Sequence, residues 1–299
     1  MEREAFLAYL TEKPRLLDGG MGSLLIAAGL EPGRAPERWL LDRPESVRAA
    51  HAAYVEAGSD IIQTNTFGAS PPKLSASGLG SRCADVNALA VTIAKEAAGG
   101  RALVAGDLGP TGLLRPPVGR ASDAEFLRAF EEQASALADA GADLLSIETM
   151  FDLSEALAAV KAARETGLPV AASMTFEKRK RGFFTIMGDP LVPSLKSLAD
   201  AGADVVGFNC SVTSEVMLEM VREAAGTLSV PLMAQPNAGQ PRQGPDGITY
   251  GASPDLFARD LTAMVLAGAR IVGGCCGTDP AFIGTTRAAL NVALLKAHA

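Results

Sequence analysis

Hydrophobic and polar positions follow one arrangement that returns four times along the chain. Each copy has the end of a predicted helix with an Ala-Gly pair, then a polar residue, and then a run of apolar residues. Glycine at that place is typical of a helix C-terminus, and an unbroken apolar run is typical of a buried parallel strand. The four copies are residues 56–65, 139–148, 200–210 and 267–276.

Four further apolar runs complete a set of eight predicted strands: residues 14–18, 101–107, 169–176 and 231–237. The stretches between strands are rich in Ala, Leu and Glu, as in residues 122–140 and 154–166, and they predict helices. Eight strands alternating with helices in 299 residues predict an α/β fold, a single-domain (β/α)8 TIM barrel. The alternative is an open doubly wound sheet, but no glycine-rich dinucleotide loop follows the first strand.

The barrel domain is expected to take in residues 1–299. Residues 1–13 predict a short amphipathic N-terminal helix, with acidic residues where a secretory signal would be basic. Two segments rich in Pro, Gly or charge, residues 109–120 and 177–190, follow the third and fifth strands. We expect both to be loops on the functional rim of the barrel rather than domain linkers.

Charge and composition exclude several classes of function. A net charge of −7 argues against nucleic acid or an anionic membrane as the main partner. No stretch approaches the roughly 20 apolar residues of a membrane span, so we expect a cytoplasmic protein. Four cysteines in a chain of this length favour metal binding or catalysis over a disulfide framework.

Polar side chains and cysteines stand at the carboxyl ends of the predicted strands, where barrels of this kind carry their chemistry. Three of the four cysteines fall on this one rim. In chain order the residues at the strand ends are Asp18, Asn65, Thr66, Asp107, Glu148, Thr175, Cys210, Asn237, Cys275 and Cys276.

The three rim cysteines could share one metal ion. One strand separates Cys210 from Cys275 and Cys276, so the backbones lie about 10 Å apart at the usual strand spacing. Two cysteine side chains, each with a Zn–S bond of about 2.3 Å, can span that gap. Both neighbouring thiols face the ion only if the last strand ends in a turn, and the glycines at 273–274 and Gly277 permit the backbone angles of such a turn.

Other interpretations of the cysteines are a redox dithiol or simple packing. A redox pair normally has C-x-x-C spacing, which is absent here. We interpret Cys83 as a small apolar filler of the core. His51 lies in a predicted helix and His298 in the C-terminal tail, which leaves no Ser-His or Cys-His machinery.

A zinc ion with three cysteine ligands keeps one position for water or substrate. Three thiolates on a dication leave a net charge of −1, which disfavours hydroxide formation and suits the binding of another thiolate. A free thiol with a pKa near 8.5 is only a few per cent ionised at pH 7, a cost of about 2 kcal/mol that coordination removes. The cysteines therefore predict a thiol substrate and alkyl transfer to sulfur.

A family resemblance supports this chemistry. It is carried by the motifs L-L-D-G-G-M-G, G-S-D-I-I-Q-T-N-T-F-G-A, G-D-L-G-P-T-G, I-E-T, G-F-N-C, P-N-A-G and G-G-C-C-G-T. Over about residues 10–292 the chain is similar to the homocysteine S-methyltransferase family. That family includes the homocysteine-binding module of cobalamin-dependent methionine synthase and the enzymes that use betaine or S-methylmethionine. The resemblance implies a zinc-dependent barrel that methylates homocysteine to methionine.

Carried over residue by residue, the resemblance implies that Cys210, Cys275 and Cys276 are the zinc ligands. It also implies that Asp18 and Glu148 hold the amino group of homocysteine, a role that suits unpaired carboxylates near a thiol site.

The segment Asn65, Thr66 and Phe67 falls where the family lines its substrate pocket. The amide oxygen of Asn237 could occupy the open metal position until substrate arrives, or Asn237 could only hydrogen-bond the loop.

Several features of the sequence bear on the methyl donor. Thr149, not an aromatic residue, follows Glu148, and Trp39 is the sole tryptophan, which disfavours a betaine cage. The residues after Glu148 resemble the methionine-synthase module most closely, so we expect methylcobalamin as the donor. It would be carried by a separate corrinoid protein or domain, because the chain lacks a D-x-H-x-x-G signature. The charged segment 177–181 could help such a partner to dock.

Three alternatives stay open. The first is a homocysteine S-methyltransferase that uses S-methylmethionine or S-adenosylmethionine. The second is a methyltransferase that moves methyl from a different donor onto a corrinoid protein. The third is a non-catalytic zinc-binding barrel that serves as an assembly subunit.

Overall fold

Eight parallel strands form one closed barrel in the computed structural model, which describes residues 1–244 and 247–297. The strand order is β1-β12-β9-β8-β5-β4-β3-β2, and a parallel bridge between Leu17 and Ile61 joins the two edges. The predicted barrel is therefore confirmed, and the open sheet is excluded. The barrel strands are β1 (Arg15–Leu16), β2 (Ile61–Gln63), β3 (Leu103–Leu108), β4 (Leu144–Met150), β5 (Val170–Met174), β8 (Val205–Thr213), β9 (Leu232–Asn237) and β12 (Ala269–Val272).

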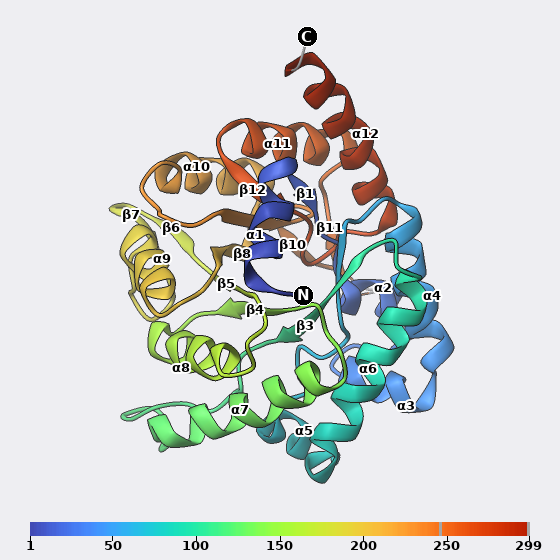
Figure 1. Cartoon of the computed structure of the whole chain (residues 1–299), viewed down its shortest axis with the longest axis vertical. Coiled ribbons are helices and arrows are strands. Elements are labelled where there is room, and N and C mark those ends of the chain that lie inside the picture. The colour runs from blue at the N-terminus through green and yellow to red at the C-terminus, as the bar shows by residue number, and fades with distance from the viewer. Residues whose placement is uncertain (245–246, 298–299) are drawn as a thin grey trace.

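Helices surround the barrel on the outside (Figure 1). No helix within the described residues is long and apolar enough to cross a bilayer. His298 lies outside the described residues. The helices are α1 (Arg3–Glu12), α2 (Met21–Ala27), α3 (Trp39–Asp42), α4 (Pro44–Glu56), α5 (Pro71–Ala76), α6 (Cys83–Ala98), α7 (Asp123–Asp139), α8 (Leu153–Arg164), α9 (Leu191–Asp200), α10 (Ser214–Ala224), α11 (Pro254–Leu266) and α12 (Pro280–Ala297), with 3-10 turns at η1 (Pro36–Arg38) and η2 (Gly80–Arg82).

Each copy of the fourfold sequence repeat contains the end of a helix and the start of the next strand. Its glycines, Gly58, Gly141, Gly202 and Gly268, all have φ between 93° and 118°. This left-handed conformation ends a helix at little steric cost only in glycine. The predicted helix ends are confirmed.

The polar residue of the repeat is an aspartate in three copies, Asp60, Asp143 and Asp204. Each carboxylate accepts a hydrogen bond from a backbone N–H near the start of the preceding barrel strand. The donors are Leu16, Val104 and Val170, at 2.8, 2.7 and 2.9 Å. Each aspartate thereby satisfies a backbone donor at the lower edge of the sheet, which explains why the repeat carries a buried or half-buried charge there.

The barrel interior changes from apolar to polar along the strands. At the amino ends, Phe6 and Leu10 of α1 pack on the lowest inward-facing side chains, such as Ile61 and Val205, and α1 lies across the middle of the ring of strands (Figure 1). Above this floor lies a hydrogen-bonded polar layer. Its bonds run from Gln235 Nε2 to Gln63 Oε1, from Gln63 Nε2 to Ser146 Oγ and from Ser173 Oγ to Asn209 Oδ1, at 3.1, 3.0 and 2.9 Å.

The two predicted rim loops differ in structure. Residues 109–120 contain no helix or strand, and the segment is held near its start, where Glu155 accepts hydrogen bonds from the Thr111 N–H and hydroxyl at 2.8 and 2.7 Å. Residues 177–190 are not a plain loop, because β6 (Glu177–Arg179) and β7 (Gly182–Phe184) form an antiparallel hairpin. A second hairpin, β10 (Pro241–Gly244) with β11 (Gly247–Tyr250), follows β9 and was not predicted.

Candidate active site and metal centre

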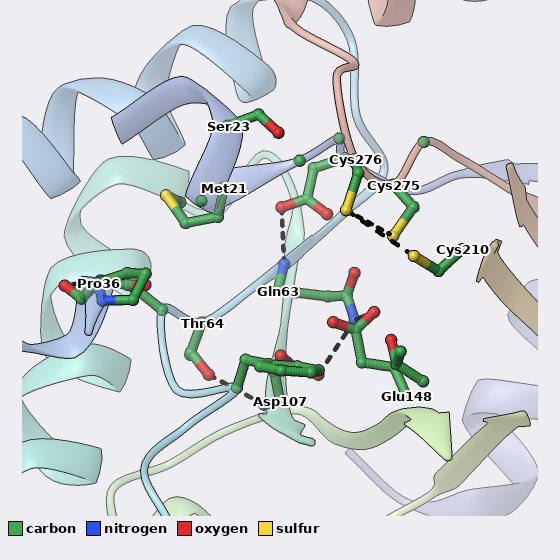
Figure 2. A pocket seen from close by; sticks show the side chains of 18 of the residues that line it. Met21, Ser23, Pro36, Gln63, Thr64, Asp107, Glu148, Cys210, Cys275 and Cys276 are labelled. Atoms are coloured by element: carbon green, nitrogen blue, oxygen red, sulfur yellow. Dashed lines mark hydrogen bonds between the residues drawn. The ribbon is translucent and has the colours of Figure 1, made fainter. Parts of the chain in front are cut away.

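The three predicted rim cysteines meet at the carboxyl end of the barrel, and their sulfurs point toward one another (Figure 2). The sulfur of Cys276 lies 3.8 Å from that of Cys210 and 4.0 Å from that of Cys275, and all three lie within 4.8 Å of one another. A tetrahedral ion with Zn–S bonds of about 2.3 Å places its sulfurs about 3.8 Å apart. The donor set and its spacing therefore fit one zinc ion.

The ionisation of the cluster also suits a cation. Hydrogen bonds from the Cys275 and Cys276 thiols stabilise a thiolate at Cys210, which lowers the pKa of Cys210 to about 3. The same hydrogen bonds raise the pKa of Cys276 to about 12 and that of Cys275 well above its ordinary value. One negative charge is thus shared by three sulfurs, and a dication that binds them would release the remaining protons.

The glycines around Cys275 and Cys276 have two different roles. Gly277 has a φ of 80°, as the predicted turn requires, but Gly273 and Gly274 are not in the left-handed region. A Cβ atom at Gly273 would lie 2.7 Å from the Leu17 side chain, and one at Gly274 would lie 2.3 Å from Thr278. The expectation that all three glycines supply unusual angles is therefore wrong for these two, which instead allow close packing.

Cys210 reaches the cluster through an irregular end of β8. Cys210 and Ser211 have φ of 61° and 59°, and the pairing of β8 with β9 shifts between Asn209 and Thr213. Two consecutive non-glycine residues in this conformation carry a cost of order 1–3 kcal/mol each. Such strain persists where the surrounding structure enforces it, and here it sits on a metal-binding candidate.

A cavity of about 230 Å³ opens beside the sulfurs. None of the described residues that line it carries a positive charge. Its lining includes Asp18, Met21, Glu37, Gln63, Asn65, Phe67, Asp107, Glu148, Thr149 and the three clustered cysteines.

The two carboxylates predicted to hold an amino group both face this cavity. Asp18 is buried; its Oδ2 accepts from the Gln63 N–H at 2.9 Å, while its Oδ1 has no partner. Burial raises the pKa of Asp18 well above its ordinary value, and the Glu148 charge adds to the effect. Burial likewise raises the pKa of Glu148 to about 7, with a further contribution from the Cys210 charge. A cationic ligand would stabilise the ionised form of both carboxyl groups.

The structure adds acidic groups and a linking amide that the sequence analysis did not assign to the site. Asp107 and Glu37 also line the cavity, and burial raises the pKa of each. Gln63 donates to Asp107 Oδ1 at 3.3 Å and lies 3.5 Å from Glu148 Oε2; Figure 2 shows it in the middle of the site. A polar residue two positions after Ile61, on an inward-facing position of a buried strand, was the available signal for Gln63.

Of the three residues predicted to line the substrate pocket, two line the cavity and one lies behind it. Asn65 and Phe67 line the cavity, and Asn65 Nδ2 donates to the Pro36 carbonyl at 2.9 Å. Thr66 is not among the described residues that line it; its buried hydroxyl donates to the Asp107 carbonyl at 2.7 Å. Thr66 therefore supports Asp107 from behind.

Asn237 lies outside the described lining but close to the metal centre. Its amide hydrogen-bonds the Cys210 thiolate, and its buried Oδ1 has no partner.

Cys83 is buried in the core between helices, and Asn87 Nδ2 lies 3.4 Å from its sulfur. His51 is buried in α4 with neither ring nitrogen bonded, and neither Cys83 nor His51 is among the described residues that line the cavity.

Comparison with known sequences gives one family, and the curated relatives include two methionine synthases. Residues 15–290 match the protein family described as homocysteine S-methyltransferase. The chain is 32% identical over 303 residues to methionine synthase of Mycobacterium tuberculosis and 30% identical over 303 residues to that of Mycobacterium leprae. Each alignment covers 95% of this chain and 25% of the relative, so the chain spans about a quarter of the length of these curated relatives.

Comparison with solved structures gives a match over nearly the whole of both chains. The metallated form of the homocysteine methyltransferase MmuM from Escherichia coli is 28% identical, with a TM-score of 0.79, and the match covers 94% of this chain and 98% of that one.

Proposed function

This chain belongs to the homocysteine S-methyltransferase family, and from that premise we propose that it transfers a methyl group to the thiol of L-homocysteine to form methionine. The observation that carries the proposal is the meeting of three thiols, the buried carboxylate of Asp18 and the half-buried carboxylate of Glu148 around one cavity. The thiols offer a metal site for the substrate sulfur, and Asp18 and Glu148 offer negative charge for its ammonium group.

We assign Cys210, Cys275 and Cys276 as the ligands of one zinc ion, with the fourth position left for the substrate sulfur. When bound, zinc lowers the pKa of a coordinated thiol and leaves its sulfur nucleophilic at neutral pH. We assign Asn237 as the residue that faces the open position without substrate, because its buried Oδ1 has no partner.

Asp18 and Glu148 orient the amino acid. The unpaired Oδ1 of Asp18 accepts a hydrogen bond from the ammonium group, and the ammonium charge favours ionised Glu148. Asn65 and Phe67 form part of the cavity wall beside the ammonium group. Thr66 supports this wall through its hydrogen bond to the Asp107 carbonyl. With the amino group held there, the side-chain sulfur extends toward the three cysteines.

The reaction then needs positioning more than acid–base catalysis. The substrate thiol loses its proton to water, the S–C bond forms, and the donor–methyl bond breaks with its electron pair left on the donor. The contribution of the protein is to hold the sulfur in line with the methyl group.

The donor that we propose is methylcobalamin on a separate corrinoid protein or domain. Support comes from the methionine synthases among the relatives and from exposed apolar side chains in segments that follow barrel strands at their carboxyl ends. These side chains are Phe67, Leu114, Val118, Ile186, Met187 and Ile248, which are 37–75% exposed. Apolar groups near the mouth suit a large partner that covers it.

A sulfonium donor, S-methylmethionine or S-adenosylmethionine, is the second candidate. The observation in its favour is the surplus of acid in the cavity: Asp107 and Glu37 line it besides the pair assigned to the ammonium group, and no described lining residue is cationic. A positively charged donor would compensate that charge.

A donor panel tests both. The zinc-loaded protein is incubated with homocysteine and, separately, methylcobalamin, S-methylmethionine, S-adenosylmethionine and betaine, with methyltetrahydrofolate as the negative control, and methionine is measured by mass spectrometry. Methionine from methylcobalamin supports the proposal, and methionine from a sulfonium alone supports the second candidate. No methionine from any donor, with zinc bound, would refute the proposed function.

A further inference from the structure

Asn209 precedes Cys210 in the G-F-N-C motif, and its side chain is fully buried. Its Oδ1 accepts hydrogen bonds from the Thr149 N–H at 2.8 Å and the Ser173 hydroxyl at 2.9 Å. Its Nδ2 donates to Thr149 Oγ1 at 2.7 Å and to Glu148 Oε2 at 3.1 Å. A buried amide with both ends bonded is fixed in orientation.

The same nitrogen also reaches the metal centre. Asn209 Nδ2 lies 3.9 Å from Cys275 Sγ. Because one atom lies near both groups, Glu148 Oε2 and Cys275 Sγ are at most about 7 Å apart. Asn209 therefore links the carboxylate assigned to the ammonium group with a cysteine assigned to the metal.

The backbone that carries Glu148 depends on this amide. Thr149 has a φ of 59°, which is an outlier for a β-branched residue, and the pairing of β4 with β5 shifts between Ile147 and Met150. Asn209 bonds the backbone N–H and the hydroxyl of Thr149. Strained turns of this kind persist only where neighbouring groups enforce them, so Asn209 holds the turn that presents Glu148.

We propose that Asn209 is a positioning residue that fixes the distance between Glu148 and the three-cysteine site, and that this distance selects homocysteine over cysteine. The two amino acids differ by one methylene, which changes the reach from ammonium to sulfur by about one C–C bond of 1.5 Å. When Glu148 holds the ammonium group and the three-cysteine site holds the sulfur, only a substrate side chain of one length reaches both. The inference rests on the proposed function.

The test measures binding without a methyl donor. Isothermal titration gives the affinities of the zinc-loaded protein for L-homocysteine and L-cysteine, and elemental analysis gives the zinc content. The wild type should prefer homocysteine at least about tenfold, as one methylene in a fitted site allows. Asn209→Ala and Asn209→Asp should bring the ratio to within about threefold by weakening homocysteine binding, with zinc retained.

Asn209→Asp keeps an oxygen acceptor for the Thr149 N–H and the Ser173 hydroxyl but loses the nitrogen donor to Thr149 Oγ1 and Glu148 Oε2. It is isosteric with asparagine, so it tests the proposal if Asn209→Ala does not fold. Ser173→Ala is the matched control, because it removes one bond to the same amide and leaves the Glu148 contact; its ratio should equal that of the wild type.

A wild-type ratio in Asn209→Asp, or an equal loss of affinity for both thiols, overturns the role of Asn209. A wild-type protein that holds zinc but binds neither thiol overturns the proposed function itself, so the two failures are distinguishable.

Discussion

Cys210 Sγ and Cys276 Sγ lie 3.8 Å apart, although 66 positions separate them in the chain. β9 lies between β8 and β12 in the sheet, so the two thiols do not meet across adjacent strands. They meet because both strand ends leave regular β geometry, at the left-handed pair Cys210–Ser211 and at Gly277. Metal binding should therefore depend on these turns as well as on the thiols.

Replacing any of Cys210, Cys275 or Cys276 by serine should reduce zinc retention by about two orders of magnitude or more, because a hydroxyl is a poor substitute for a thiolate ligand. Methionine formation should be lost, while circular dichroism shows a folded barrel, since the ligands lie at the rim. Cys83→Ser is the control and should keep one zinc per chain by elemental analysis. Full activity in any rim variant would contradict the assignment.

Gly277→Ala should weaken zinc binding as well as the fold. A Cβ atom there would lie 2.2 Å from the Tyr250 ring, and φ is 80°. Gly226→Ala is a matched control, because its φ of 75° is similar but nothing lies within 4 Å of the added atom. The control should lose about 1 kcal/mol of unfolding free energy with zinc binding unchanged, as measured by urea denaturation and chelator competition. Equal zinc affinity in both variants would show that the turn does not position the ligands.

Asp18→Asn should weaken homocysteine binding about 10- to 100-fold, because it removes one charge-assisted hydrogen bond to the ammonium group. Zinc binding should stay within about twofold, since the predicted effect lies at the amino end of the substrate. Titration calorimetry and elemental analysis measure the two quantities on the same sample. A parallel loss of zinc would mean that Asp18 belongs to the metal centre instead.

His51 should make the fold sensitive to acid. Burial lowers the pKa of His51 to about 4 from 6.5, so between these values the unfolded chain binds a proton that the folded chain does not. Stability therefore falls as the pH falls through this window, by about 2 kcal/mol at pH 5. In His51→Leu, the loss of unfolding free energy between pH 7.5 and pH 5.0 should be smaller by that amount. An unchanged pH dependence would show that His51 is protonated inside the fold.

Phe6→Ala should destabilise the barrel without changing its chemistry. Phe6 is fully buried against the apolar floor at the amino ends of the strands, and losing such a ring costs about 3–5 kcal/mol. Urea denaturation should show this loss, while zinc content and homocysteine affinity below the transition stay at wild-type values, because the site lies at the other end of the barrel. A large change in homocysteine affinity would link the two ends.

Local pattern was enough to predict the barrel and the metal-binding candidates. The apolar runs, the helix-ending glycines such as Gly141 and the cysteines at strand ends are each readable over about ten residues, because burial and left-handed backbone angles impose periodicity and glycine locally. Parallel strands bring their carboxyl ends to one rim. Strand order therefore placed Cys210 and the final strand on the same rim, one strand apart.

The remainder was decided by contacts between distant segments. Glu37 lines the cavity because the 3-10 turn η1, distant in sequence from the other acidic residues there, lies beside it. The backbone angles of Thr149 and Cys210 are unusual for their residue types, so no local preference signals them. The amide of Asn209 lies between Glu148 and Cys275 because the closed barrel brings their three segments together. Sequence alone determined the eight barrel strands, the helices between them and the rim that bears the thiols, but not the two rim hairpins. Tertiary structure decided which side chains converge there, because convergence depends on long-range packing that enforces strained local geometry.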